Sequence, residues 1–233
     1  KIDRDITIQM MGDWGIANLH RLCGWLAMEM GSRSGPGSRF ATWNGQGGTD
    51  AIKAVLSGIV DTSFFVPAPF AKTVYEGRGI YSGDNVNRLR AIATLPQDDR
   101  LVIAIQSKYG VKTLDDLRHE KPPLTIALAF DDGENMVGFA TNRLLKAANM
   151  SRKELENWGC SFLEGEAPWD TMPHAIDGTA DAVIFEAIMT PYWKELQAKH
   201  EMTFIPVDDE VLTALEREYG WPRGTIPQDR FAG

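Results

Sequence analysis

Cysteine is scarce in this 233-residue sequence: only Cys23 and Cys160 occur, and neither lies in a C-x-x-C or zinc-ligand spacing. Two free thiols are therefore expected, and they fix no redox compartment. Long apolar runs are also missing, so no segment is expected to span a membrane. The chain opens on polar residues without a signal-peptide pattern, which fits either a cytosolic protein or a mature form that has lost its leader.

Positive charge is in deficit, with 24 Lys and Arg against 32 Asp and Glu and a formal net charge of −8. A nucleic-acid-binding domain normally carries a basic face, so this class of protein is disfavoured. An anionic ligand stays open, because helix N-termini and single arginines can bind one.

Catalytic motifs are missing as well. The sequence has no G-x-S-x-G, H-E-x-x-H, P-loop or G-x-G-x-x-G pattern. Its four histidines lie apart from one another and from any nucleophile motif: His20, His119, His174 and His200. We therefore predict that the protein is not an enzyme and that it has no catalytic residue, metal site or cofactor.

The sequence contains a regular alternation of short apolar runs and amphipathic segments, which predicts an α/β fold with mainly parallel sheets flanked by helices. Glycines and capping residues separate the two kinds of segment. Thr49 or Asp50 is expected to cap one helix, and Gly58 to end it. The expected strands cover residues 6–11, 39–43, 62–66, 89–95, 101–106, 124–130, 160–165, 181–187 and 202–207.

The two halves of the chain also resemble each other. The stretch "ITIQMMGDWG" before one helix is matched by "LTIALAFDDG" before another. Later, "AVLSGIVDTSFF" is matched by "HAIDGTADAVIF", with a G-x-x-D turn at Gly58 and Asp61 and again at Gly178 and Asp181. A glycine after a helix is common, but two matches at similar spacing predict two similar lobes.

Ligands of open α/β sheets bind at the carboxyl ends of the strands, close to helix N-termini. The loops expected there contain aromatic rings, carboxylates, amides and glycines that can approach a ligand closely. The tryptophans can also be packing residues, the aspartates helix caps and the asparagines turn residues. Glu186 either pairs with an arginine or binds a cationic group. The candidate ligand-binding residues are Asp13, Trp14, Trp43, Asn44, Gly48, Thr49, Phe65, Val66, Asp131, Asp132, Asn135, Trp169 and Glu186.

Several stretches together resemble a known family: "TDAIKAVLSGIVDTSFF", "VKTLDDLR", "IALAFDDGENM", "AIDGTADAVIFEA" and, most specifically, "FIPVDDEVLTALEREYGWPRGTIPQDRFAG". They are similar to TAXI-type solute-binding receptors of TRAP transporters, in the wider NMT1/THI5-like group. The sequence departs from that pattern at "DDGEN" and at Trp14 in "GDWG".

The resemblance implies a two-lobed type II periplasmic-binding-protein fold. Lobe 1 is expected at residues 1–104, lobe 2 at 105–204, and 205–233 is expected to return to lobe 1. Because the chain of the family continues beyond this point, the sequence is expected to be truncated.

The same resemblance implies a periplasmic or membrane-tethered extracytoplasmic receptor. It would capture a small organic solute, such as a carboxylate, amino acid or aromatic acid, and deliver it to integral membrane transporter subunits. Two alternatives stay open: the receptor of an ABC importer for an aromatic acid, sulfonate or nitrate, and an enzyme on the same scaffold, such as a decarboxylase, dehydratase or pyrimidine synthase.

Overall fold

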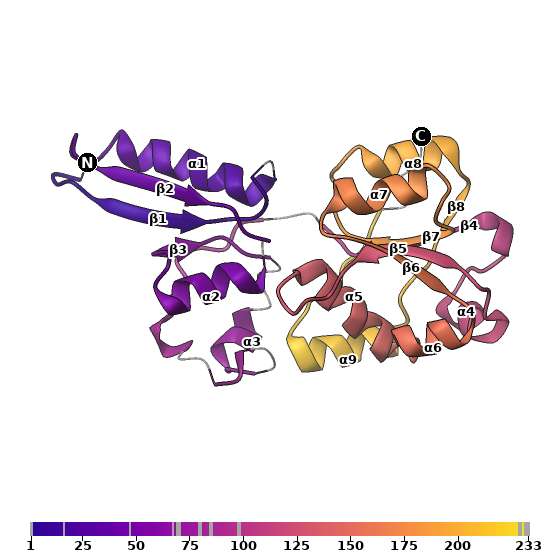
Figure 1. Cartoon of the computed structure of the whole chain (residues 1–233). Helices are drawn as coiled ribbons and strands as arrows, with labels where there is room; N and C mark the ends of the chain where they lie inside the picture. The colour runs from indigo at the N-terminus through magenta and orange to yellow at the C-terminus, as the bar shows by residue number, and fades with distance from the viewer. Residues whose placement is uncertain are drawn as a thin grey trace. The chain divides into compact units, whose positions relative to one another are not determined.

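The protein divides into two compact units, which are described separately (Figure 1). Unit 1 comprises Lys1–Thr94 with Gly133–Met136, and unit 2 comprises Leu95–Asp132 with Val137–Gly233. The computed structural model describes residues 2–15, 17–46, 48–66, 68, 71–78, 81–83, 86–96, 99–227 and 230. Within these residues, no helix is both long enough and apolar enough to cross a lipid bilayer.

Unit 1 is built on a three-stranded parallel sheet of order β2-β1-β3. Its strands are β1 (Thr7–Met11), β2 (Arg39–Trp43) and β3 (Thr62–Ser63). Its helical segments are α1 (Asn18–Gly31), α2 (Thr49–Ser57), α3 (Ala71–Tyr75) and the 3-10 helix η3 (Val86–Arg88). Figure 1 shows α1 on one face of this sheet and α2 on the other.

Unit 2 has a five-stranded sheet of order β6-β5-β7-β4-β8. The strands are β4 (Val102–Gln106), β5 (Thr125–Ala129), β6 (Ser161–Gly165), β7 (Ala182–Phe185) and β8 (Met202–Phe204). Strand β4 runs antiparallel to both its neighbours, whereas β5 is parallel to β6 and β7. The helical segments are η4 (Ser107–Tyr109), α4 (Leu114–Glu120), α5 (Met136–Ala147), α6 (Arg152–Asn157), α7 (Pro168–Ile176), α8 (Tyr192–Lys199) and α9 (Asp209–Tyr219).

The core of unit 2 explains why its strands form. Strands β4, β5 and β7 are almost wholly buried apolar runs, as expected of strands covered on both faces. Helices α7 and α8 cover one face, where Trp193 and Phe185 are fully buried. Figure 1 places α4, α5, α6 and α9 on the opposite face. The predicted α/β class, with mainly parallel sheets and flanking helices, is confirmed.

The predicted internal repeat is also confirmed. Strand β1 and the start of α1 correspond to β5 and the start of α5 at one constant offset, since Thr7, Met11 and Asn18 match Thr125, Ala129 and Met136. The parallel pairing of β1 with β2 runs residue for residue over five positions, and the pairing of β5 with β6 does the same. The same strand–loop–helix unit therefore occurs twice.

The two G-x-x-D turns are structurally alike. Gly58 and Gly178 adopt left-handed conformations, with φ of 79° and 77°. The carboxylate of Asp61 accepts the backbone N–H of Gln9 at 2.8 Å, and the backbone N–H of Asp61 donates to the Gln9 carbonyl at 2.9 Å. Asp181 makes the same reciprocal pair of bonds with one residue, Thr125, at 3.0 and 2.7 Å. Each aspartate therefore clasps the first strand of its own repeat, β1 or β5, through two backbone hydrogen-bonding groups of one residue.

The segment after α3 differs from the prediction. Residues 89–95 were expected to form a strand, but in the described residues they belong to no β-ladder and most of their side chains are exposed. Strand β3 is likewise shorter than the predicted 62–66. Apolar pattern alone does not make a strand, because the backbone also needs a neighbouring strand to accept its hydrogen bonds.

Residues 205–227 lie in unit 2. The sequence had predicted that they return to lobe 1. The buried face of α9 includes Val211 and Leu215. Beyond them, the Tyr219 and Trp221 rings stack at 4.6 Å, and both meet the ring of Phe139 on α5 edge-on. This aromatic cluster attaches the described part of the tail to unit 2. The first boundary also falls at Leu95 rather than at residue 104.

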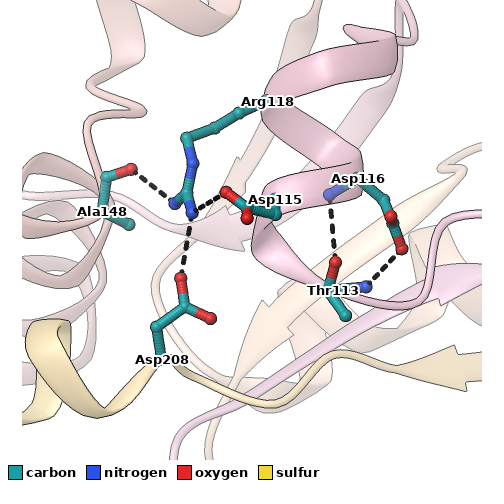
Figure 2. Close-up of polar contacts among 6 residues, drawn as sticks. All are labelled: Thr113, Asp115, Asp116, Arg118, Ala148 and Asp208. Carbon is teal, nitrogen blue, oxygen red and sulfur yellow. Dashed lines mark hydrogen bonds and ion pairs between the residues drawn. The ribbon is translucent and has the colours of Figure 1, made fainter.

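A second contact fixes the start of α9. Arg118 of α4 donates to Asp115 at 2.7 Å, to Asp208 at 3.0 Å and to the backbone carbonyl of Ala148 at 3.1 Å (Figure 2). Helix α4 itself begins in a capping box, in which the side chains of Thr113 and Asp116 each accept the backbone N–H of the other residue (Figure 2). One arginine thus joins the helix before β5, the end of α5 and the start of the tail.

Candidate functional site

The loops that follow the three strands of unit 1 converge at the carboxyl edge of its sheet. The N–H of Gly12, after β1, donates to the carbonyl of Trp43 at the end of β2 at 3.4 Å. The N–H of Gly45 donates back to the carbonyl of Asp13 at 3.1 Å. Phe64, just after β3, donates to the last residue of β1 at 2.9 Å. The chain segments that follow the three strands are therefore held together at one edge of this sheet.

Asp13 lies in the loop after β1, and its side chain binds the start of α1. Its buried carboxylate accepts the backbone N–H groups of Leu19 at 3.1 Å and His20 at 2.6 Å. These are among the N–H groups that a helix start leaves without an internal partner. Burial raises the pKa of Asp13, and the two hydrogen bonds partly oppose that rise. The geometry therefore gives Asp13 a structural function as the cap of α1.

Asp50 orders the loop between β2 and α2. Its carboxylate accepts the backbone N–H of Gln46 at 2.6 Å and that of Gly48 at 3.2 Å, so it holds the loop against the first turn of α2. Thr49 does not cap: it is fully buried, and its hydroxyl lies 3.0 and 2.9 Å from the carbonyls of Gly133 and Glu134. The prediction that Thr49 or Asp50 caps this helix was wrong, because Gly48 is the N-cap and, in the described structure, no side chain caps the free N–H groups of α2.

Glycine is required in this loop for steric reasons. A Cβ atom at Gly48 would lie 2.6 Å from the Cβ of Met136, closer than side chains approach. At Gly15 an added Cβ would lie 3.0 Å from the amide oxygen of Asn44. Gly48 therefore allows its loop to pack closely against Met136, and Gly15 lies against the side chain of Asn44. The predicted approach of these glycines to a ligand stays a prediction.

The aromatic and amide candidates of unit 1 differ in accessibility. Trp43 is 46% exposed and its indole N–H donates to the side chain of Gln9 at 3.1 Å. Asn44 beside it is exposed, and Trp14, Phe65 and Val66 are partly buried. Trp43 and Asn44 thus offer an accessible ring and an accessible amide at the carboxyl edge. Asn135, clustered with this unit, is fully buried.

Unit 2 repeats the arrangement at its own carboxyl edge. The N–H of Phe130, after β5, donates to the carbonyl of Gly165 at the end of β6 at 3.1 Å, as Gly12 does to Trp43 in unit 1. Asp131 accepts the side-chain amide of Asn142 at 3.0 Å and lies 4.0 Å from a guanidinium nitrogen of Arg143, both on α5.

The remaining candidates of unit 2 lie after the ends of three neighbouring strands. Asp132 is exposed and follows β5, Trp169 is half-buried at the start of α7, and Glu186 is half-buried directly after β7. The structure therefore brings Asp131, Asp132, Trp169 and Glu186 to one edge of one sheet. Three of these four side chains are carboxylates, and one of them, Asp131, lies beside Arg143.

Comparison with known protein families identifies the chain. The family model described as the NMT1-like family matches residues 28–232, which is most of the sequence. The chain belongs to the NMT1-like family. No curated protein sequence matches it. The predicted membership of the wider NMT1/THI5-like group is thus borne out at the level of the family, whereas the TAXI assignment within it stays a prediction.

Several solved structures similar to this NMT1-like chain are named as solute-binding proteins. The alkanesulfonate-binding protein SsuA from Xanthomonas axonopodis pv. citri, bound to MOPS, is 13% identical, with a TM-score of 0.46 over 88% of this chain and 62% of that one. The periplasmic aliphatic sulphonate-binding SsuA from Escherichia coli is 14% identical, with a TM-score of 0.47 over 85% and 56%.

A third similar structure is the sulfate-binding protein SubI from Mycobacterium tuberculosis H37Rv, at 12% identity and a TM-score of 0.43 over 86% and 70%. This chain thus spans less than two thirds of the length of either SsuA protein. At these identities and TM-scores the likeness carries no argument about a ligand.

Sequence reasoning missed several residues at the carboxyl edge of unit 2 in this NMT1-like chain. Thr171 of α7 is fully buried, and its hydroxyl has no hydrogen-bond partner within the described part of the protein. It lies beside Gly165, where an added Cβ would be 2.5 Å from the hydroxyl oxygen. Ala187 adopts a left-handed φ of 65°, and Asp99 accepts the N–H of Ile188 at 2.9 Å. No sequence signal distinguishes an alanine with positive φ from any other alanine.

The cysteines of the NMT1-like chain show no sign of activation. Both are free and buried, as expected from their spacing. Burial raises the pKa of Cys23 to about 11, with a further contribution from the charge of Asp13, so its thiol is protonated at neutral pH. A nucleophilic cysteine requires the opposite shift. Among the described residues, no group of His, Cys, Asp or Glu is arranged to hold a metal ion.

Proposed function

We propose that this NMT1-like protein is an extracytoplasmic solute-binding receptor. It captures a small organic solute between its two lobes and delivers it to the integral membrane subunits of a transporter. The observation that carries the proposal is the repeated carboxyl edge, in which each unit joins its strand ends to a helix start in the same way. Ligands of open α/β sheets bind at such an edge, so each unit has a surface of the kind that holds a small solute.

The recognition groups follow from the residues at these edges. In unit 1, Trp43 supplies an accessible aromatic surface and Asn44 an accessible amide. In unit 2, Asp131, Asp132 and Glu186 supply negative charge. Apolar area from the rings would give affinity, and a few placed polar groups would orient the solute. Trp14, Phe65 and Val66 in unit 1 and Trp169 in unit 2 are the other partly exposed candidates. The buried Gly48, Thr49 and Asn135 would support the loops of unit 1 rather than contact the solute, as Asp13 does by capping α1.

The three carboxylates at the edge of unit 2 favour some classes of solute over others. A carboxylate edge attracts a protonated amine and repels a simple anion. Among the carboxylates, amino acids and aromatic acids that a receptor of this kind would carry, an amino acid offers both a cationic group and an anionic group. We therefore place amino acids first, aromatic acids second and dicarboxylates last.

The membrane partner is proposed by resemblance. The tail that begins at "FIPVDDEVL" is similar to TAXI-type receptors, which favours TRAP membrane subunits driven by an ion gradient. An ABC importer is the alternative, and the two make different demands on transport. Vesicles reconstituted with the protein and its membrane subunits would take up solute on an ion gradient for TRAP, and only with internal ATP for an ABC importer.

The first experiment is a thermal-shift screen of the protein against amino acids, dicarboxylates, aromatic acids, sulfonates and sulfate. A ligand at one hundred times its Kd adds about 2.7 kcal/mol of stability. For a chain of this size such a gain raises the Tm by several degrees. A shift with no chemical change in the ligand supports a receptor. Turnover of the ligand would instead support the enzyme alternative.

Site variants connect that binding to the proposed residues. Trp14→Ala and Glu186→Ala should each weaken solute binding while leaving the circular dichroism spectrum unchanged. Matched controls are Trp25→Ala, an exposed tryptophan of α1, and Glu210→Ala, an exposed glutamate of α9, which should bind as the unmodified protein does. Equal affinity in all four variants would rule out the proposed site.

A further inference from the structure

The chain turns where strand β7 ends, at a residue with an uncommon backbone conformation. Ala187 has a left-handed φ of 65°. Two other non-glycine residues of the described structure have positive φ, and both lie at helix ends: Lys121 after α4 and Asn149 after α5. A left-handed residue is an ordinary way to end a helix. Ala187 instead follows a strand and is buried, so its conformation needs another explanation.

Contacts on both sides hold Ala187 in this conformation. Before it, the carbonyl of Glu186 accepts the indole N–H of Trp193, a fully buried residue of α8, at 3.1 Å. After it, the N–H of Ile188 donates to the carboxylate of Asp99 at 2.9 Å. The two peptide groups that flank Ala187 are therefore fixed by side chains from outside the turn.

A left-handed alanine costs free energy unless its surroundings impose it. In this region the Cβ of an L-residue lies too close to a carbonyl oxygen, so a turn without other contacts would leave it. Residues held in such regions gather at binding sites and switches, where the surrounding structure determines their conformation. The hydrogen bonds made by Trp193 and Asp99 supply that determination at Ala187.

The turn lies where a ligand of this sheet is expected. Because the strand order is β6-β5-β7, the chain passes from β5 to β6 on one side and then crosses back to β7 on the other. The connecting helices α5 and α6 lie on one face of the sheet and α7 lies on the opposite face (Figure 1). Open α/β sheets bind ligands at the carboxyl ends of the strands where this direction changes, here β5 and β7. Glu186 is the first residue after β7.

We propose that Asp99 and Trp193 are positioning residues that hold Glu186 ready for the ammonium group of an amino-acid solute. They act through the left-handed turn that follows it. The inference rests on the proposed function, in which Glu186 contacts the solute. The pairing of β7 with β4 fixes the chain before Glu186, and the two hydrogen bonds fix the chain after it. A carboxylate that is already in place loses little conformational freedom when a solute binds, which favours affinity.

The contacts of Asp99 indicate support of the turn rather than direct contact with the solute. Asp99 is partly buried, and one of its carboxylate oxygens accepts the backbone N–H groups of both Arg100 and Ile188 at 2.9 Å. The turn therefore needs an oxygen acceptor from Asp99 and not its negative charge. An asparagine side chain also carries such an acceptor, so the two functions can be separated by substitution.

The first test compares Asp99→Ala, which removes the acceptor, with Asp99→Asn, which keeps it. Binding is measured by isothermal titration calorimetry with four probes that share an α-ammonium group: glycine, glutamate, arginine and phenylalanine. For a probe that binds the unmodified protein, Asp99→Ala should weaken binding about five- to thirtyfold, the factor that corresponds to the cost of a left-handed residue. Asp99→Asn should bind as the unmodified protein does. Trp193→Phe removes the N–H but keeps an aromatic ring, and it should also weaken binding.

The substitution Ala187→Gly makes the test specific to the turn. Glycine adopts the left-handed region without steric cost, so the turn no longer depends on Asp99. Ala187→Gly alone should bind as the unmodified protein does, and combining it with Asp99→Ala should restore binding. Urea denaturation of every variant without a probe measures stability separately. If Asp99→Ala lowers stability but leaves affinity unchanged, Asp99 is only structural and the inference is overturned.

The remaining outcomes separate this inference from the proposed function. Equal loss of affinity in Asp99→Ala and Asp99→Asn, or failure of Ala187→Gly to restore binding, would overturn the inference and leave the receptor in place. Unchanged affinity in Glu186→Ala would overturn the proposed solute contact, and the inference with it. Binding of none of the four probes by the unmodified protein would overturn the amino-acid solute and the inference together.

Discussion

The two units build the same contact between a strand end and a helix start, but they place the glycine on opposite partners. In unit 1, the loop residue Gly12 lies against the start of α1, where an added Cβ would lie 2.6 Å from the backbone nitrogen of His20. In unit 2, the loop position holds Phe130 and the helix position holds Gly138, where an added Cβ would overlap the Phe130 carbonyl oxygen. Phe130 and Gly138 stand where the repeat places Gly12 and His20.

This exchange shows that the repeat preserves a geometry rather than a residue. The close approach of loop and helix needs one position without a side chain, and either position will serve. The same freedom appears in the sheets: Thr62 of β3 pairs with Met10, whereas Ala182 of β7 pairs with Ile126, the counterpart of Ile8. That shift of two residues keeps each side chain on its own face, because strands alternate faces with a period of two.

The largest effect is expected from filling the glycine positions. Gly138→Ala should destabilise the protein by about 3 kcal/mol or more, because the new Cβ meets fixed backbone. Gly12→Ala should also destabilise it, by less. Gly24→Ala in α1 is the control: nothing lies within 4 Å of its added Cβ, so it should gain about 1 kcal/mol. Urea denaturation measures all three, and a neutral Gly138→Ala would refute the proposed close approach.

A smaller difference should separate the two clasps. Asp181→Asn should cost about 1–2 kcal/mol, because its side chain, 20% exposed, also accepts a 3.1 Å ion pair from Lys108. Asp61→Asn should cost less, because Asp61 is exposed and no ion pair to it is seen in the described residues. Thermal melts of the two variants make the comparison. Equal losses would mean that the clasp depends on the turn alone and not on its surroundings.

The Asp181 clasp should also respond to acid. Burial would raise the pKa of Asp181, but hydrogen bonds from Tyr109, the Thr125 amide and Lys108 together hold it below the ordinary 3.8. A lowered pKa in the folded state stabilises the protein above the unfolded value, and this stabilisation is lost as the pH falls through the folded value. The loss of unfolding free energy in Asp181→Asn should therefore become smaller as the pH falls below 3.8. A deficit independent of pH would contradict this charge-based explanation.

The smallest effect concerns the two thiols. Burial raises the pKa of both Cys23, to about 11, and Cys160. Neither thiol should react appreciably with a disulfide reagent in the folded protein, and both should react after unfolding in urea. Cys160, 8% exposed, should react before the fully buried Cys23 if local opening occurs. Rapid labelling of Cys23 in the native state would contradict its burial on the inner face of α1.

The sequence predicts the repeated elements well because their signals are local. Apolar runs flanked by glycine predict β1 and β5, and Gly58 and Gly178 mark the helix ends. The capping box that Ser151 forms at the start of α6 is another feature of this local kind. Such features depend on residues a few positions apart, so they can be inferred without knowing the rest of the fold.

The features that the sequence does not reveal depend on distant partners. Residues 89–95 have the pattern of a strand, but no strand beside them appears in the described structure. The tail joins unit 2 through the packing of Tyr219 and Trp221 on Phe139, which no local pattern indicates. The candidate site is intermediate. Its loops could be located from strand ends, but the capping function of Asp13 and the buried hydroxyl of Thr171 required the fold.

The aspartate clasp has a consequence for how such a chain can change. Asp61 and Asp181 each bind the opening strand of their repeat across 52 and 56 residues of chain, so each repeat has its two ends fastened together. A segment closed on itself in this way can be copied, or joined to a new neighbour, without losing the contact that defines its limits. Each repeat therefore contains the contact that closes it, and this contact is the same in the two units although the neighbouring elements differ.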